Sequence, residues 1–162
     1  MTKKEKIIYI AGFFDGEGTL SRQLKGSRLI FRITISQTNF EVLSKIVKFT
    51  EIGFIIKITK RKSHWKEAWV YYIARQEDVL FFLKKIKSRI VVKKYIVKKA
   101  IPELQLLIIN KIERRNKLMG RIKKTRTLRE KGWTYRDIGR VLQVDWGYVR
   151  RLDKGIIGKS VL

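Results

Sequence analysis

The sequence contains no cysteine and only one histidine, His64, among its 162 residues. Without cysteine the chain cannot form disulfides, thiolate zinc sites or a thiol nucleophile. One imidazole also excludes most nucleases and metal sites that depend on histidine. Chemistry at an active site would therefore have to use carboxylates, lysines and water.

Acidic residues are scarce relative to basic ones. The chain has 14 Asp and Glu against 39 Lys and Arg, which gives a formal net charge of +25. A charge of this size destabilises the compact state by self-repulsion unless an anionic partner is present. The imbalance predicts a nucleic-acid partner.

Long apolar runs are also missing. Runs such as LQLLII, residues 104–109, are far shorter than the roughly 18 residues that a membrane-spanning helix needs. The N-terminal stretch KKEKIIYIAGFF looks like a signal peptide, but Asp15 and Glu17 stand where small neutral residues should lead to cleavage. We expect an intracellular protein, cytoplasmic or organellar, that is not secreted and has no membrane partner.

Residues 7–16 have the pattern of a buried helix. At about 100° per residue, one face carries Ile7, Ile10, Ala11 and Phe14, and a second carries Ile8, Gly12, Asp15 and Gly16. A helix that is apolar nearly all round is buried on several sides. The two glycines on the second face leave room for the backbone of another helix.

From Thr19 the hydrophobic period changes from helical spacing to alternation. Residues 19–37 predict a hairpin with its turn at KGS, residues 54–74 return to strands, and helices are expected within 39–53 and 76–90. This order predicts an α+β domain with an antiparallel four-stranded sheet and helices on one face. We expect the other face to bind a DNA major groove. The residues assigned to that face are Ser21, Gln23, Lys25, Arg28, Ile30, Arg32, Thr34, Lys57, Thr59 and Arg61.

The chain after Lys93 is predicted to be helical, with Pro102 either starting or kinking a helix. We divide the sequence into a core, residues 1–110, and a basic helical extension, residues 111–162. Residues 126–154 resemble a helix-turn-helix, with helices at 135–142 and 146–152. The extension is expected to contact DNA, although its two helices could instead pack on a partner subunit. The assigned residues are Arg136, Arg140, Trp146, Tyr148, Arg150 and Arg151.

Residues 10–18, IAGFFDGEG, resemble the LAGLIDADG motif of homing endonucleases, and the predicted α-ββ-α-ββ-α order is that of the family core. The resemblance covers residues 1 to about 110. It implies an intron-encoded, site-specific endonuclease that cuts double-stranded DNA at a long, partly palindromic target. Because the chain has one copy of the motif, it implies a homodimer. The alternatives are an RNA maturase that binds its host intron RNA and a DNA-binding regulator without catalysis.

The two acidic residues of the motif have a physical reason to attract cations. A carboxylate at a helix C-terminus faces the negative end of the helix dipole, and two paired helices would bring two such ends together. Carboxylate and carbonyl oxygens suit Mg²⁺. The resemblance implies that Glu17, with the carbonyl of Gly16, holds this catalytic metal, with Mn²⁺ or Ca²⁺ as substitutes for binding. Glu17 replaces the Asp that is common in the family.

Further site residues follow from the resemblance. It implies that Gln37 positions water and that Lys93 offsets phosphate charge, with Lys94 as the substitute if the register shifts. The plainer alternatives are a strand end for Gln37 and a solvated surface lysine for Lys93. The expected dimer interface consists of Ile8, Gly12, Asp15 and Gly16, with Asp15 capping and holding the helix pair.

Overall fold

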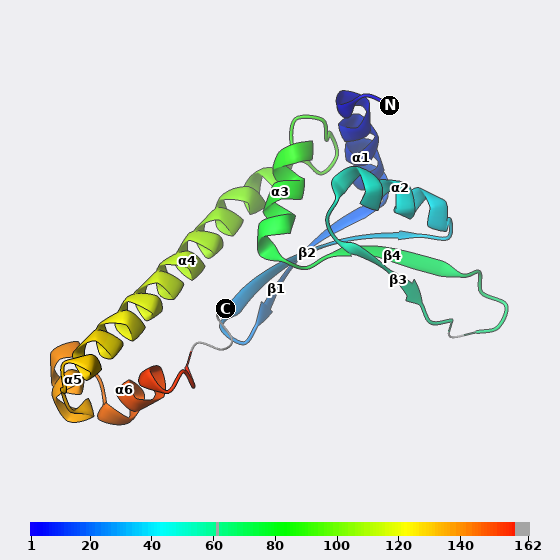
Figure 1. Cartoon of the computed structure of the whole chain (residues 1–162). Helices are drawn as coiled ribbons and strands as arrows, with labels where there is room; N and C mark the ends of the chain where they lie inside the picture. The colour runs from blue at the N-terminus through cyan, green and yellow to red at the C-terminus, as the bar shows by residue number, and fades with distance from the viewer. Residues whose placement is uncertain (61, 158–162) are drawn as a thin grey trace. The chain divides into compact units, whose positions relative to one another are not determined.

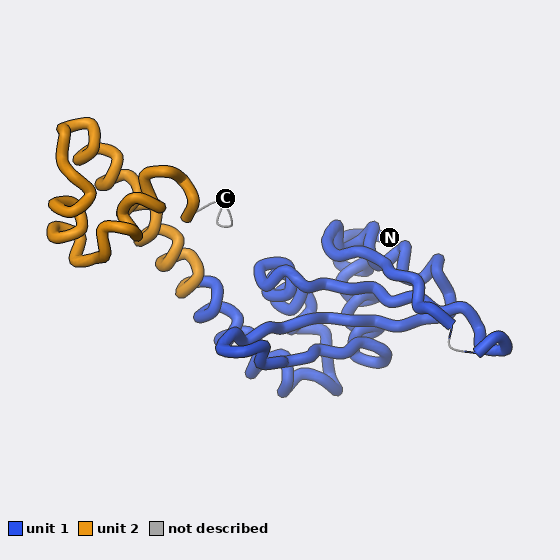
Figure 2. The backbone as a smooth tube through the Cα atoms, turned by 90° about the horizontal axis from the view of Figure 1, so that it is seen from below, with its two compact units in different colours: residues 1–108 blue, residues 109–162 orange. Residues whose placement is uncertain are grey.

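The structure is a computed structural model that describes residues 1–60 and 62–157. The chain divides into two compact units, residues 1–108 and 109–162, which Figure 2 colours separately. Arg61, which was assigned to the DNA-binding face, lies outside the described residues.

The first unit contains a four-stranded antiparallel sheet with strand order β1-β2-β4-β3. Its elements are α1 (Lys3–Glu17), β1 (Gly18–Lys25), β2 (Arg28–Gln37), α2 (Phe40–Thr50), β3 (Phe54–Ile58), β4 (Ala68–Ile73), α3 (Gln76–Ile86) and the beginning of α4 (Lys94–Glu130). Helices α1, α2 and α3 lie on one side of the sheet (Figure 1). The predicted α+β class and element order are confirmed.

The core lies between these helices and one face of the sheet. Ile10, Ala11 and Phe14 of α1 are fully buried there, as their shared face predicted. From β2 the same core receives Phe31 and Ile35. Each large apolar side chain buried in this way stabilises the fold by about 1.5–3 kcal/mol. The core therefore fixes the direction of α1 and the position of its C-terminal end.

Strand register decides which side chains face the helices. Ile35 of β2 pairs with Tyr71 of β4, and Tyr71 pairs with Ile55 of β3. Since paired residues share a face, this row points into the core. The next row, Thr34, Tyr72 and Phe54, lies on the opposite face, which we call the open face.

Pro102 lies inside α4, so it does not begin a helix. The second unit contains the rest of α4, followed by α5 (Tyr135–Leu142) and α6 (Trp146–Asp153). Thr134 caps α5 by accepting the N–H of Asp137, and Asp145 caps α6 by accepting the N–H groups of residues 147 and 148. Within the described residues, no helix is long and apolar enough to cross a membrane.

The turn between α5 and α6 depends on a close backbone contact. A Cβ atom on Gly139 would lie 2.8 Å from the carbonyl oxygen of Val144, which is closer than real Cβ contacts allow. Gln143, which ends α5, adopts a left-handed conformation with φ 53°. Ile138, Val149 and Leu152 are buried in this unit. α5 thus has the predicted bounds, and α6 ends one residue after the predicted 152.

Candidate active site and nucleic-acid surface

Glu17 is the last residue of α1, and its side chain is exposed. Gly18 follows and begins β1. A Cβ atom on Gly18 would lie 2.2 Å from Cδ2 of Phe14, so no larger residue fits where the chain passes from helix to strand. The sequence therefore places a carboxylate at the point where the buried helix meets the sheet.

Asp15 is held by the backbone of its own chain. Its Oδ2 accepts the N–H groups of Val91 at 2.7 Å and Val92 at 2.9 Å, and its Oδ1 accepts the N–H of Lys93 at 2.8 Å. Desolvation alone would raise the pKa of Asp15, but these N–H groups and the Lys93 charge outweigh it and hold the pKa below its ordinary value. Asp15 thus ties the end of α1 to the chain just before α4.

Lys93 places a positive charge at the same end of α1. Its Nζ donates to the carbonyl oxygen of Asp15 and, at 3.3 Å, to that of Gly16. It also lies 5.9 Å from the centre of the Phe14 ring. A cation is favourable at a helix C-terminus because it faces the negative end of the dipole. The structure thus brings Lys93 to Gly16, one of the two residues expected to hold a metal, whereas Lys94 is exposed as the first residue of α4.

Gln37 is placed differently. It is the last residue of β2 and pairs with Trp69, which puts it on the same face as Ile35. Its Oε1 accepts the N–H of Thr38 at 3.2 Å. The strand-end explanation accounts for this contact, and the water-positioning role of Gln37 stays a prediction.

The open face of the first hairpin carries the residues assigned to it. In β1 and β2 these are Ser21, Gln23, Lys25, Arg28, Ile30, Arg32 and Thr34, which form cross-strand rows with one another or, for Thr34, with Thr19. No acidic residue of β1 or β2 lies among them. This half of the face is therefore polar and positively charged.

The assignment of Lys57 to the open face is wrong. Lys57 pairs with Trp69 and shares the helix-side face with Ile55, where its Nζ forms an ion pair with Glu67 at 2.8 Å. Thr59 lies beyond the end of β3. The positions on the open face belong instead to apolar residues. β3 has the sequence FIIKI, with apolar residues at both parities, so alternation alone does not decide which face Lys57 occupies.

The second face of α1 is uncovered. Ile8 is 46% exposed, and a Cβ atom on Gly12 or Gly16 would meet nothing within 4 Å. This is the face on which the sequence predicted contact with another helix. Both carboxylate oxygens of Asp15, the fourth member of the expected interface, already accept hydrogen bonds from N–H groups of its own chain.

The donor set at the end of α1 fits a hard cation only in part. Among the described residues, no three His, Asp or Glu side chains come together as a metal-binding group. One chain offers the Glu17 carboxylate and the carbonyl of Gly16, which also accepts the Lys93 ammonium at 3.3 Å and keeps a second lone pair. Mg²⁺ is commonly held by one or two carboxylates together with substrate phosphates and water, so two protein oxygens are compatible with this ion when the remaining ligands come from elsewhere.

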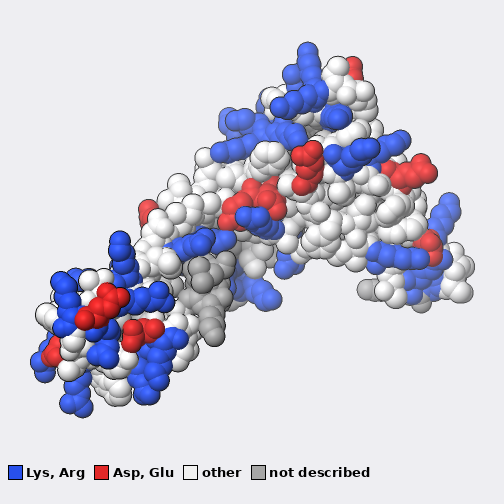
Figure 3. Space-filling view, viewed as in Figure 1, with Lys and Arg blue, Asp and Glu red and all other residues white. Residues whose placement is uncertain are grey.

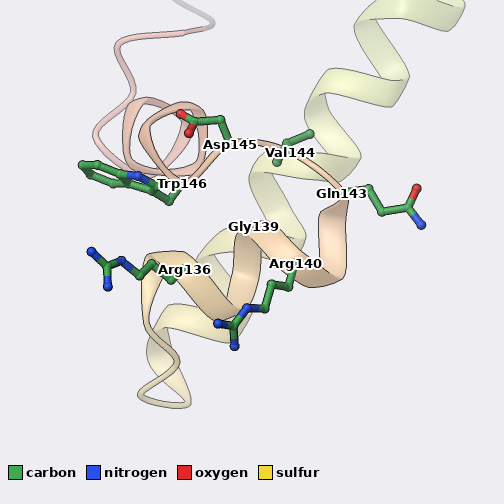
Figure 4. A pocket seen from close by; sticks show the side chains of 7 residues that line it. All are labelled: Arg136, Gly139, Arg140, Gln143, Val144, Asp145 and Trp146. Carbon is green, nitrogen blue, oxygen red and sulfur yellow. The ribbon is translucent and has the colours of Figure 1, made fainter.

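The second unit presents basic and aromatic side chains. Arg136, Arg140, Arg150, Arg151 and Trp146 are exposed, and Tyr148 is half-buried. Arg136 from α5 and Trp146 from α6 extend to the same side of a pocket at the turn (Figure 4). Figure 3 shows Lys and Arg side chains gathered over this unit, with few acidic side chains among them.

The sequence does not predict that the backbone N–H groups of residues 91–93 bind Asp15. Their contribution is made by backbone N–H groups, which carry no residue signature. The available signal was Asp15 itself, because a carboxylate on a buried helix needs donors.

Asp15→Asn is expected to lower the free energy of unfolding by about 2 kcal/mol at neutral pH, since it removes charge-assisted hydrogen bonds to N–H groups. The folded pKa of Asp15 lies below its ordinary value of 3.8. The ionised Asp15 therefore contributes its full stabilisation of the folded state above pH 3.8. This contribution is lost as the pH falls through the lowered pKa of the folded state. Urea unfolding at pH 7 and below pH 4 should show a gap between the proteins that narrows in acid. Glu41→Gln, on the exposed start of α2, is the control; an equal gap at both pH values would refute this account.

Several proteins of known structure have a similar architecture. A solved archaeal intron-encoded homing endonuclease, I-Vdi141I in complex with DNA, is similar over 94% of this chain and 98% of its own, with 24% identity and a TM-score of 0.57. The homing endonuclease I-CvuI, bound to its target with Ca, is similar over 65% of this chain and 69% of its own, with 18% identity and a TM-score of 0.56. The LAGLIDADG meganuclease I-AabMI is similar over 64% of this chain but only 38% of its own, with 19% identity and a TM-score of 0.55.

No curated protein sequence matches the chain. The likenesses to solved structures fall below 25% identity, so they establish the fold. The model of the LAGLIDADG-like domain family matches residues 4–87, which is more than half of the chain and includes the motif helix, both hairpins, the helix α2 between them and α3. The protein therefore belongs to the LAGLIDADG-like domain family.

Proposed function

We propose that this protein is a site-specific endonuclease that cuts double-stranded DNA with a divalent metal ion and acts as a homodimer. One observation carries the proposal. The exposed Glu17 ends the motif helix directly after Gly16, whose carbonyl accepts from the Lys93 ammonium group, and the next residue begins a hairpin whose open face is basic and lacks acids. A carboxylate that could hold a metal thus lies directly next to a surface suited to DNA.

In this proposal Glu17 and the carbonyl of Gly16 hold Mg²⁺. When bound, the ion would lower the pKa of water and stabilise the oxygen that leaves a phosphodiester. Lys93 contributes a fixed positive charge at the end of α1 that offsets the charge of a DNA phosphate. Asp15 acts through position, because its three N–H contacts hold Lys93 against the helix end.

The homodimer rests on the uncovered face of α1. Two copies that pack along Gly12 and Gly16 would bring two Glu17 carboxylates to one place, where one copy has too few ligands. A two-fold contact of this kind also gives each DNA strand its own Glu17. A partly palindromic target follows from the same symmetry.

Named relatives support the finer parts of the proposal. I-Vdi141I is described as intron-encoded and in complex with DNA, and I-CvuI complexes were formed with Mg or with Ca. We extend the intron-encoded role, the DNA substrate and the divalent metal to this chain on that basis. Location inside the cell, in the cytoplasm or an organelle, follows from a DNA substrate.

The second unit is proposed to add DNA contacts in the manner of a helix-turn-helix. Its two capped helices meet at a tight turn, and exposed arginines lie on both. In such modules the second helix lies in the major groove and its first residues reach base edges. Trp146 and Tyr148 occupy that part of α6, while Arg136 and Arg150 are placed to meet phosphates.

The function can be tested with purified protein and a pool of random-sequence DNA duplexes, together with DNA that spans the uninterrupted insertion site of the host gene. With Mg²⁺ present, we expect cleaved molecules to share one long, partly symmetric sequence, and EDTA should prevent the cut. Unspecific degradation, or no cleavage of either DNA with any of Mg²⁺, Mn²⁺ or Ca²⁺, would overturn the proposal.

Arg136→Gln combined with Arg150→Gln should weaken binding to all duplexes alike and make it less dependent on salt. Each lost phosphate contact lowers the slope of log affinity against log salt by about 0.9. The slope can be measured by fluorescence anisotropy between low and moderate salt. Lys87→Gln, an exposed change at the end of α3 on the helix side, should leave the slope as it is. An unchanged slope in the double variant would mean that the second unit packs against protein instead.

A further inference from the structure

The open face of the sheet is divided into two chemically different halves. The first hairpin presents basic and polar side chains, whereas the second presents Phe54, Ile56 and Ile58 from β3 opposite Tyr72, Val70 and Ala68 from β4. The three β3 side chains are 52%, 46% and 40% exposed. None of these six residues belongs to the hydrophobic core or packs against it. We call them the apolar patch.

The apolar patch favours aggregation unless another molecule covers it. β3 is an edge strand of the sheet, and an exposed apolar edge invites aggregation. Strand preference favours β-branched and aromatic residues alike, but it does not require Phe54, Ile56 and Ile58 to stand exposed side by side on one face. The rings of Phe54 and Tyr72 are 5.4 Å apart and tilted by 58°. Both aromatic surfaces are thus turned to the side of the sheet away from the helices.

The patch is continuous with the basic half of the open face. Thr34 pairs with Tyr72, and Tyr72 pairs with Phe54, so one cross-strand row joins the two halves. A long ligand that lies along the basic half and continues in the same direction would therefore meet the patch. The two hairpins run from this row in opposite directions (Figure 1), which gives the open face the length needed to follow a groove.

The surroundings of the patch favour a polyanion. Lys60, Lys62 and Lys66 are exposed in the loop that joins β3 to β4, and the one acid nearby, Glu67, is paired with Lys57. Figure 3 also shows basic side chains gathered at this end of the first unit. A second copy of the chain on this patch would bring like charges together, whereas a DNA duplex would place phosphates beside the lysines.

We infer that the apolar patch reads thymine methyl groups in the major groove of the DNA target. Base edges in that groove present hydrogen-bonding groups and one apolar group, the C5 methyl of thymine. Apolar side chains on a groove-facing strand can therefore distinguish bases only through this methyl. The first hairpin would read donors and acceptors, and the second would select thymine. The inference rests on the proposed DNA-binding function.

Deoxyuridine provides the direct test because it differs from thymidine only by the missing methyl group. Duplexes are first enriched from a random pool by binding to the full-length protein in Ca²⁺, and each thymine is then replaced in turn. We expect affinity to fall about fourfold for each buried methyl that is removed. Ile56→Thr, which keeps the β-branched shape but replaces one apolar arm of the side chain with a hydroxyl, should reduce this loss at specific thymines.

Leu24→Thr is the matched control, since Leu24 is an apolar strand residue, 73% exposed, on the helix side of β1. It should keep the full difference between thymidine and deoxyuridine. Thermal unfolding shows whether each variant is folded. Should Ile56→Thr not fold, wild-type protein can be cross-linked to duplexes with 5-bromodeoxyuridine, whose bromine takes the place of the methyl; cross-linked peptides should contain residues 54–58 or 68–73.

The outcomes separate the inference from the function on which it rests. If no duplex is enriched, both are overturned. If a specific duplex is enriched but deoxyuridine binds as well as thymidine everywhere, the inference alone is overturned. The same conclusion follows if Ile56→Thr keeps the discrimination in full, or if the cross-links map outside β3 and β4.

Discussion

Glu17→Gln is expected to reduce DNA cleavage by orders of magnitude and to leave DNA binding intact or slightly tighter. The amide keeps the size and polarity of the side chain but loses the charge that attracts Mg²⁺, on which water activation and leaving-group stabilisation depend. Less negative charge then faces the phosphates. Because a carboxylate at a helix C-terminus opposes the dipole, the variant should be as stable as the parent or more so.

The measurements are cleavage of a selected duplex in Mg²⁺, affinity in Ca²⁺ and the free energy of unfolding. Glu17→Asp is the informative control, because it keeps the charge and restores the acid that is common in the family; it should retain metal-dependent cleavage. A Glu17→Gln protein that unfolds readily but cleaves normally per folded molecule would identify Glu17 as a structural cap. The active site would then lie elsewhere.

Sequence reasoning succeeded where the determinants are local. The bounds of α5 and α6 follow from Thr134 and Asp145, whose side chains bind N–H groups two or three residues ahead. The buried face of α1 follows from spacing alone. The first hairpin follows from the alternation along its second strand and from Gly26, whose φ of 60° suits a tight turn.

It failed where a distant segment decides the outcome. The face of Lys57 depends on how β3 pairs with β4, and FIIKI permits either parity. The contacts of Asp15 depend on backbone N–H groups more than seventy residues away. The apolar patch was likewise hidden, because the second hairpin was read as basic. These errors share a cause: long-range pairing selects between alternatives that the local pattern leaves equal.

The uncovered glycine face of α1 leads to the second large effect. Gly12→Leu should convert a dimer into a folded monomer and abolish cleavage of both strands. Within one chain a side chain at this position meets open space, and replacing a helical glycine improves helix propensity by up to about 1 kcal/mol. The monomer should therefore tolerate the change. Between two copies the added side chain stands where the helices approach most closely, and two-fold symmetry places it there twice.

Light scattering over a range of concentrations should give the wild type a mass near twice 19.3 kDa and the variant a mass near that of one chain. Gly120→Leu is the matched control, since Gly120 lies in α4 and a Cβ there also meets nothing within 4 Å. It should leave both mass and cleavage unchanged. A Gly12→Leu protein that is still dimeric would contradict the paired-helix arrangement, and so would a wild-type monomer that cuts both strands. Either result would mean that the Glu17 carboxylates reach the DNA without contact between two copies along the Gly12 face of α1.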